Sequence, residues 1–246
     1  PAPRHERTVL LLEGCVQPLT APQTNAAAAR VLDRLGISAI SAAEAGCCGA
    51  VDYHLSAHEQ ARRQLRRNID AWWPHVEAGA EALIMTASGC GAMVTEYGDI
   101  LADDPAYADK AARIAAMTID LSSFLAREEL TSLSGIGHGR RVAFQAPCTL
   151  QHAQATTGVV EGILEQAGYT VTEVADAHLC CGSAGTYSIL QPELSQRLRD
   201  NKLEALGRGQ PELIATANIG CQLHLAGGSG TPVRHWIELL DPEALI

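Results

Sequence analysis

The cysteines of this 246-residue chain recur in one spaced pattern that is present twice. The first set is Cys15, the adjacent pair Cys47 and Cys48, and Cys90. The second set lies 133 residues later for three members and 131 residues later for the last, and it consists of Cys148, Cys180, Cys181 and Cys221. A repeat of this length predicts a duplicated domain rather than a short solenoid repeat.

The repeat extends beyond sulfur. A glycine follows each adjacent pair, Gly49 in the first half and Gly182 in the second. Between the halves, residues 131–139 are rich in small and turn-forming residues, which favours a linker. We therefore predict two cysteine-rich modules, residues 1–133 and residues 140–246.

Strands and helices are expected to alternate within each module. A helix over residues 26–35 is predicted to end at Gly36, and Ser56 with Glu59 forms a capping-box pattern for the next helix. Short apolar runs predict buried strands at residues 9–12, 37–40, 83–86, 142–145, 169–174 and 213–217. The expected fold class is α/β, with two tandem Rossmann-like modules that have mostly parallel sheets and are related by an internal pseudo-twofold duplication.

Each cysteine, or cysteine pair, comes shortly after one of these strands. In open α/β sheets, ligands bind in the crevice beyond the carboxyl ends of the strands, so cysteines distant in sequence are expected to meet there. Four thiolates at one sheet edge would repel one another unless a cation balanced their charge. A metal centre supplies that charge and keeps its ligands deprotonated.

The residues alone leave three interpretations of the cysteines open. Neutral buried cysteine is common, but it does not account for a duplicated adjacent pair. Structural zinc requires four ligands, and each module supplies four cysteines. Iron–sulfur clusters are also held by thiolates and tolerate widely separated ligands.

Composition narrows the class of protein. The formal charge of −10 argues against a nucleic-acid partner. No apolar run reaches the length of a membrane span and no signal peptide opens the sequence. A soluble intracellular protein is therefore expected, in which reduced cysteines serve as metal ligands or redox groups.

Several motifs carry a resemblance to a known family. They are LLEGCVQP at 11–18, GCCG at 46–49, SGCG at 88–91, APCTLQH at 146–152, CCG at 180–182, NIGC at 218–221 and HWIELL at 235–240. Together they resemble the tandem cysteine-rich CCG domains of heterodisulfide reductase and its relatives, in particular the C-terminal half of glycolate oxidase iron–sulfur subunits. The resemblance covers essentially the whole chain.

This resemblance implies an electron-transfer subunit. A flavin-containing partner subunit would oxidise glycolate, D-lactate or a similar 2-hydroxy acid, and iron–sulfur centres, of the 4Fe-4S type, would carry the electrons toward quinone. The chain itself would have little activity alone. A cytoplasmic location, peripheral at the inner membrane face, is also implied.

The same resemblance assigns the site residues. Cys148, Cys180, Cys181 and Cys221 would hold a cluster, with His224 as an additional ligand or an ordinary histidine. The other metal site would consist of Cys15, Cys47, Cys48 and Cys90, with zinc as the alternative in one module.

Two departures from the family pattern qualify these expectations. The family ends each module in Cys-x-x-Cys, whereas here the final position holds Met93 in the first module and His224 in the second. Full-length relatives also carry a ferredoxin-like region with close-set Cys-x-x-Cys runs, which this sequence lacks. A fragment is expected from the start at Pro1, with a shorter relative as the alternative.

Two further functions remain as alternatives. One is a non-redox docking scaffold of the same complex, stabilised by zinc or free of metal. The other is thiol–disulfide chemistry like that of heterodisulfide reductase. Asn68 and Asn201, also offset by 133, lie on the helix after each Cys-Cys-Gly and are interpreted as structural caps or as contacts to the cysteine loop.

Overall fold

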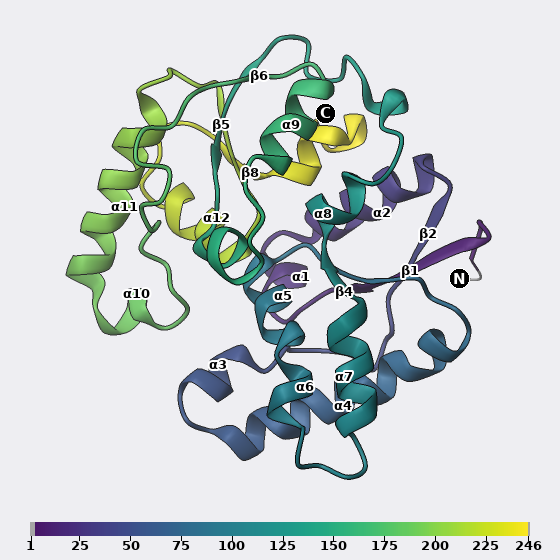
Figure 1. Cartoon of the computed structure of the whole chain (residues 1–246). Coiled ribbons are helices and arrows are strands. Elements are labelled where there is room, and N and C mark those ends of the chain that lie inside the picture. Colours follow the sequence, from purple (N-terminus) through teal and green to yellow (C-terminus); the bar gives the residue numbers. More distant parts are fainter. Residues whose placement is uncertain (1–2, 246) are drawn as a thin grey trace. The chain divides into compact units, whose positions relative to one another are not determined.

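A computed structural model describes residues 3–245, apart from the side chain of Leu245 (Figure 1). The chain divides into two compact units, of which the first ends at Phe124 and the second begins at Leu125. Residues 131–139, the predicted linker, lie within the second unit. Each unit contains a sheet of its own and is described separately.

The first unit is built on a four-stranded, entirely parallel sheet in the order β2-β1-β3-β4. Its strands are β1 (Arg7–Leu12), β2 (Ile37–Ile40), β3 (Leu83–Met85) and β4 (Thr118–Asp120). Its helices are α1 (Gln17–Thr20), α2 (Pro22–Arg34), α3 (Ala50–His54), α4 (His58–Glu77), α5 (Ser88–Thr95), α6 (Tyr97–Ile100), α7 (Ala108–Met117) and α8 (Leu121–Leu125), the last of which reaches into the second unit.

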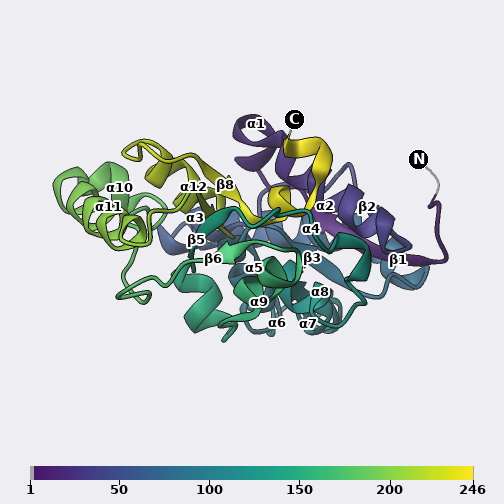
Figure 2. The ribbon, with the colours of Figure 1, turned by 90° about the horizontal axis from the view of Figure 1, so that it is seen from above.

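The second unit repeats this plan with the parallel order β6-β5-β7-β8. Its strands are β5 (Arg141–Gln145), β6 (Thr170–Val171), β7 (Leu213–Thr216) and β8 (Val233–His235). Its α-helices are α9 (Val159–Gln166), α10 (Tyr187–Leu190), α11 (Pro192–Gly207) and α12 (Ile219–Ala226), and α10 lies beside α11 in both views (Figures 1 and 2). Shorter turns are the π-helix η2 (Thr149–Ala153) and the 3-10 helices η1 (Thr131–Leu133), η3 (Trp236–Leu240) and η4 (Pro242–Leu245).

The predicted fold class is confirmed. In both sheets the first strand of the unit is central, the second lies at one edge, and the third and fourth lie on the other side of the first. The pattern did not predict the outer strands β4 and β8, because each has three residues and offers no measurable alternation. It also overestimated the strand at 169–174, of which only Thr170–Val171 pairs with β5.

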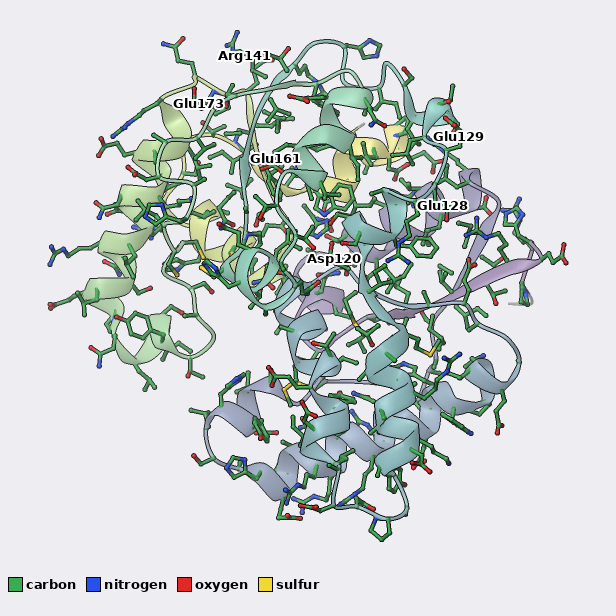
Figure 3. The ribbon with its side chains drawn as sticks, in the orientation of Figure 1. Asp120, Glu128, Glu129, Arg141, Glu161 and Glu173 are labelled. Atoms are coloured by element: carbon green, nitrogen blue, oxygen red, sulfur yellow. The ribbon has the colours of Figure 1, made fainter. Side chains whose placement is uncertain are left out.

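Helix ends follow the sequence in one place and depart from it in another. Gly36 adopts a positive φ of 75° directly after α2, as a C-terminal glycine should. The predicted capping box at Ser56 is wrong, because Ser56 has a φ of 64° and lies before the N-cap, Ala57, whose side chain bonds nothing. A side-chain cap is present at another helix, α8, where the carboxylate of Asp120 accepts a hydrogen bond from the Ser122 amide at 2.8 Å (Figure 3).

The core of the first unit lies between its sheet and α4. The helix presents one buried stripe to the core, formed by Ala61, Leu65, Asn68, Ile69 and Trp72. Its members Leu65, Ile69 and Trp72 belong to the apolar cluster that contains Leu10 of β1, as expected for a helix with one core-facing side. Among the described residues, no helix is both long enough and apolar enough to cross a bilayer.

Replacing Leu10 by Ala should destabilise the first unit by about 2–5 kcal/mol, because Leu10 is fully buried and the change leaves a cavity. Leu19→Ala is the matched control, since the Leu19 side chain is 85% exposed. Urea unfolding followed by circular dichroism measures both. An equal effect of the two changes would contradict the placement of β1 in the core.

Candidate metal centre

The cysteines of each module lie beyond the carboxyl ends of the strands, where the strand order of the sheet reverses. Cys15 follows β1 and Cys90 lies in the helix that follows β3, the two neighbouring central strands of the sheet. The adjacent pair Cys47 and Cys48 follows β2. Chain connections leave β1 and β3 in opposite directions, and in open α/β sheets this is the place, beyond the carboxyl ends of the strands, where ligands bind. The second module repeats the arrangement around β5 and β7.

In the first module the four sulfur atoms form a continuous chain of contacts. The Cys15 and Cys47 Sγ atoms are 3.4 Å apart, and Cys48 is hydrogen-bonded to both Cys47 and Cys90. Cys15 is exposed and Cys48 is buried, so the chain of sulfur atoms runs from the surface into the core. All four are free thiols.

The second module has the same order of contacts. Cys148 is hydrogen-bonded to Cys180, Cys180 to Cys181, and Cys181 to Cys221 with an Sγ–Sγ distance of 3.0 Å. Cys181 and Cys221 are buried, while Cys148 and Cys180 are half-buried. The structure therefore brings together every cysteine of each predicted set.

The contacts concentrate negative charge on one sulfur atom in each module. Hydrogen bonds from Cys15 and Cys48 hold the pKa of Cys47 far below that of an ordinary thiol, and the same contacts raise the pKa of both donors. The pKa of Cys180 is lowered in the same way by Cys148 and Cys181. The first cysteine of each adjacent pair is thus the preferred thiolate.

The glycine of each Cys-Cys-Gly motif makes this thiolate possible. Gly49 and Gly182 have φ angles of 88° and 90°, which L-residues rarely adopt. That turn directs the glycine N–H back to the first sulfur of the pair, at 3.3 Å from Gly182 to Cys180, and Gly49 bonds Cys47 likewise. A Cβ at Gly182 would collide with the Ser195 carbonyl oxygen.

The last cysteine of each set lies in the first turn of a short helix. Cys90 is the third residue of α5 and Cys221 the third residue of α12. Both cysteines therefore lie at the positive end of a helix dipole. The Asn218 amide also lies 3.7 Å from the Cys221 sulfur.

Buried polar side chains hold the first cysteine loop, and the sequence pattern had singled out Asn68 but not Tyr97. Tyr97 is fully buried, and its hydroxyl donates to the Cys48 carbonyl at 2.8 Å. Asn68 donates to the Cys47 carbonyl and accepts from the Gly46 amide, both at 2.8 Å. The loop contact considered for Asn68 is therefore present, but Asn201 is exposed. Such residues can be recognised in a sequence as polar side chains at helix positions that otherwise face the core.

The two residues that replace the family's final cysteine have different surroundings. Met93 is buried in the apolar core of the first unit. His224 Nε2 lies 3.0 Å from the Ser195 hydroxyl and 3.3 Å from its carbonyl oxygen. The His224 ring is also close enough to contribute to the low pKa of Cys180, after the stronger effect of the neighbouring thiols. Its predicted role as a ligand stays a prediction.

The donor set fits a thiophilic metal group in its chemistry, although not in its present spacing. Among the described residues, no three Cys, His, Asp or Glu side chains form a ready-made ion site. Bonds of ~2.3 Å at tetrahedral angles would place two sulfur ligands ~3.8 Å apart, wider than the 3.4 Å and 3.0 Å found here. Binding a metal group would exchange the thiol–thiol hydrogen bonds for metal–thiolate bonds, with release of the thiol protons.

Comparison with known families places these cysteines in a recognised pattern. A family model described as a cysteine-rich domain, CCG, matches residues 9–95 and again residues 142–226. The chain belongs to this cysteine-rich CCG domain family. One match lies within each unit, and together they contain all eight cysteines.

Curated relatives give the family context. The chain is 58% identical over 98% of its length to the glycolate oxidase iron-sulfur subunit of Escherichia coli K12, and 31% identical over 91% to the probable glycolate oxidase iron-sulfur subunit of Bacillus subtilis 168. It spans 59% and 50% of those two proteins. The lactate utilization protein A of Shouchella clausii is 24% identical over 95% of the chain and 98% of its own length.

A solved structure supports the fold alone. A hypothetical protein from Helicobacter pylori matches 97% of this chain and 49% of its own with a TM-score of 0.64 and 11% sequence identity.

Replacing Gly182 by Ala should destabilise the second unit by about 1–3 kcal/mol, because the change forces a strained φ and a collision with the Ser195 backbone. Gly185→Ala is the control: Gly185 also has a positive φ, 61°, but its Cβ would meet nothing within 4 Å. Urea unfolding midpoints compare the two. A loss for Gly182→Ala no greater than that for Gly185→Ala would refute the role assigned to the close contact.

Proposed function

We propose that this chain is part of the iron–sulfur subunit of a flavin-dependent 2-hydroxy-acid oxidase of the glycolate or D-lactate type. In this role it passes electrons from a flavin-containing subunit toward quinone and has little activity alone. Its further partner is a ferredoxin-like iron–sulfur region of the kind found in full-length relatives. The proposed location is cytoplasmic, peripheral to the inner face of the membrane.

The single observation that carries the proposal is the contiguous set of four thiols at the carboxyl edge of each sheet. Buried carboxylates or imidazoles would suit harder ions, whereas a set made only of thiols suits iron–sulfur clusters or zinc. The 58% identity to a glycolate oxidase iron-sulfur subunit favours the cluster over zinc. A cluster bound there would supply a one-electron carrier.

The residues of the second module have separate roles in this proposal. Cys148, Cys180, Cys181 and Cys221 hold the cluster, and His224 is an additional ligand or a neighbour of the Cys180 sulfur. The glycine N–H at Gly182 stabilises negative charge on Cys180. Burial of Cys181 and Cys221 keeps water from the inner side of the site.

The first module carries the second metal site. Cys15, Cys47, Cys48 and Cys90 provide four thiolates, and the buried Met93 offers no further strong ligand there. A 4Fe-4S cluster is proposed in this family context, with zinc as the alternative in one module. A zinc-stabilised or metal-free docking scaffold is the corresponding non-redox function.

One specific observation favours a second candidate, thiol–disulfide chemistry. The exposed Cys15 is 3.4 Å from Cys47, whose pKa is strongly lowered. A thiolate beside an accessible thiol is the arrangement that disulfide exchange requires. Rapid alkylation of these two cysteines in iron-loaded protein would favour this candidate over electron relay.

Metal and sulfide analysis of anaerobically purified protein tests the proposal. We expect iron together with acid-labile sulfide and a visible absorption spectrum, because reduced thiolates at these sites would retain a cluster. Cys181→Ala should remove the iron of the second module, since it deletes the sulfur that links Cys180 to Cys221.

Cys48→Ala is the matched variant in the first module, and it should leave the iron of the second module in place. Zinc in place of iron, or a colourless protein after anaerobic handling, would support the scaffold. Full retention of iron in Cys181→Ala would remove the second module from the assignment.

A further inference from the structure

Each module anchors the loop before its cysteine pair with a fully buried polar side chain from the long helix that comes after Cys-Cys-Gly; in the second module Ser195 of α11 also bonds the far side of the pair, by donating to the Gly182 carbonyl at 2.8 Å. In the first module this side chain is Asn68 of α4, bonded on both sides of the loop at Gly46 and Cys47. A constant offset of 133 would assign the same place in the second module to Asn201. The structure instead leaves Asn201 exposed and buries Lys202 completely.

Lys202 bonds the corresponding loop of the second module. Its Nζ donates to the Ala177 carbonyl oxygen at 2.8 Å, three residues before Cys180. Lys202 and Lys110 are the only lysines of the chain. Within the part of the chain that the structure describes, Lys202 forms no ion pair with a carboxylate.

Burying an unpaired ammonium group costs several kcal/mol, so its surroundings must offset the charge. The groups that interact electrostatically with Lys202 are the four cysteines of the second site, Cys148, Cys180, Cys181 and Cys221. Burial lowers the pKa of Lys202, and negative charge on these cysteines opposes that shift. Lysine and cysteines therefore stabilise one another in their charged forms.

We propose that Lys202 is a positioning residue of the second cysteine site, which anchors the loop before Cys180 and offsets the negative charge of the bound thiolates. The effect on a cluster rests on the proposed function; the effect on the loop does not. In the first module Asn68 performs the anchoring as a neutral amide, and the positive charge beside the cysteine pair comes from a different residue, Arg67, whose guanidinium lies against Gly46 and helps to lower the pKa of Cys47. A positive charge favours the reduced form of a nearby centre, so Lys202 raises the reduction potential of the second site.

Two substitutions separate the two effects. Lys202→Gln removes the charge and keeps a hydrogen-bond donor, whereas Lys202→Met removes both at similar length. Lys110→Met is the matched control, because Lys110 lies over the Trp73 ring in the first unit, 5.2 Å from its centroid. Potentiometric titrations are made in the Cys48→Ala background, and hydrogen–deuterium exchange is measured on each protein as purified.

We expect both Lys202 variants to shift the potential of the second site to more negative values, and Lys110→Met to leave it unchanged. Exchange of residues 174–180 should become ~tenfold faster or more in Lys202→Met, because a hydrogen bond from a charged donor is lost. In Lys202→Gln exchange should stay closer to that of the unchanged protein. A shifted potential with an ordered loop is a result that a purely structural lysine would not produce.

An unchanged potential in Lys202→Gln would overturn the role of the charge, and unchanged exchange in Lys202→Met would overturn the anchoring role. If Lys202→Met does not fold, Lys202→Gln decides through its potential. If the unchanged protein holds no iron, the proposed function fails, and exchange alone then decides whether Lys202 anchors the loop.

Discussion

Contact between four sulfur atoms at the carboxyl edge of a parallel sheet is the constraint on which each module depends. Thiols brought together in this way share protons, and negative charge collects on Cys47 and Cys180. The surrounding structure is arranged to tolerate that charge. A glycine N–H points at the thiolate, and a helix N-terminus holds the last cysteine.

The two modules share this arrangement of sulfur atoms but differ in the side chains that surround it. Both sheets have the same strand order, and both sets of sulfur atoms touch in the same sequence. Asn68 holds the first cysteine loop as a neutral amide at Gly46 and Cys47, whereas Lys202 holds the loop before Cys180 as an ammonium group at Ala177. Met93 is part of an apolar core, while His224 lies beside Ser195. Two copies of one fold thus offer two different environments for a bound metal group.

Prediction from the sequence succeeded where one local property decided the outcome. The buried strands are continuous apolar runs, and Gly36 ends its helix because only glycine adopts that φ readily. It failed where local signals compete with tertiary structure. Ser56 and Glu59 match a capping box, yet the chain turns at Ser56 and the helix begins two residues later. The strands β4 and β8 are formed by pairing with β3 and β7, not by any pattern of their own.

The sequence by itself determined that the chain is a duplicated α/β protein and that its cysteines follow the strands, because strand period, turn glycines and cysteine spacing are local properties. Only the tertiary structure decided which sulfur atoms touch, which of them is the thiolate, and which side chains support the loops. Those features depend on distances between segments far apart in the chain. Successive residues of a helix point in directions about 100° apart, so Lys202 can face the core while its neighbour Asn201 is exposed. The constant offset of 133 residues points to Asn201 and therefore does not identify the buried residue.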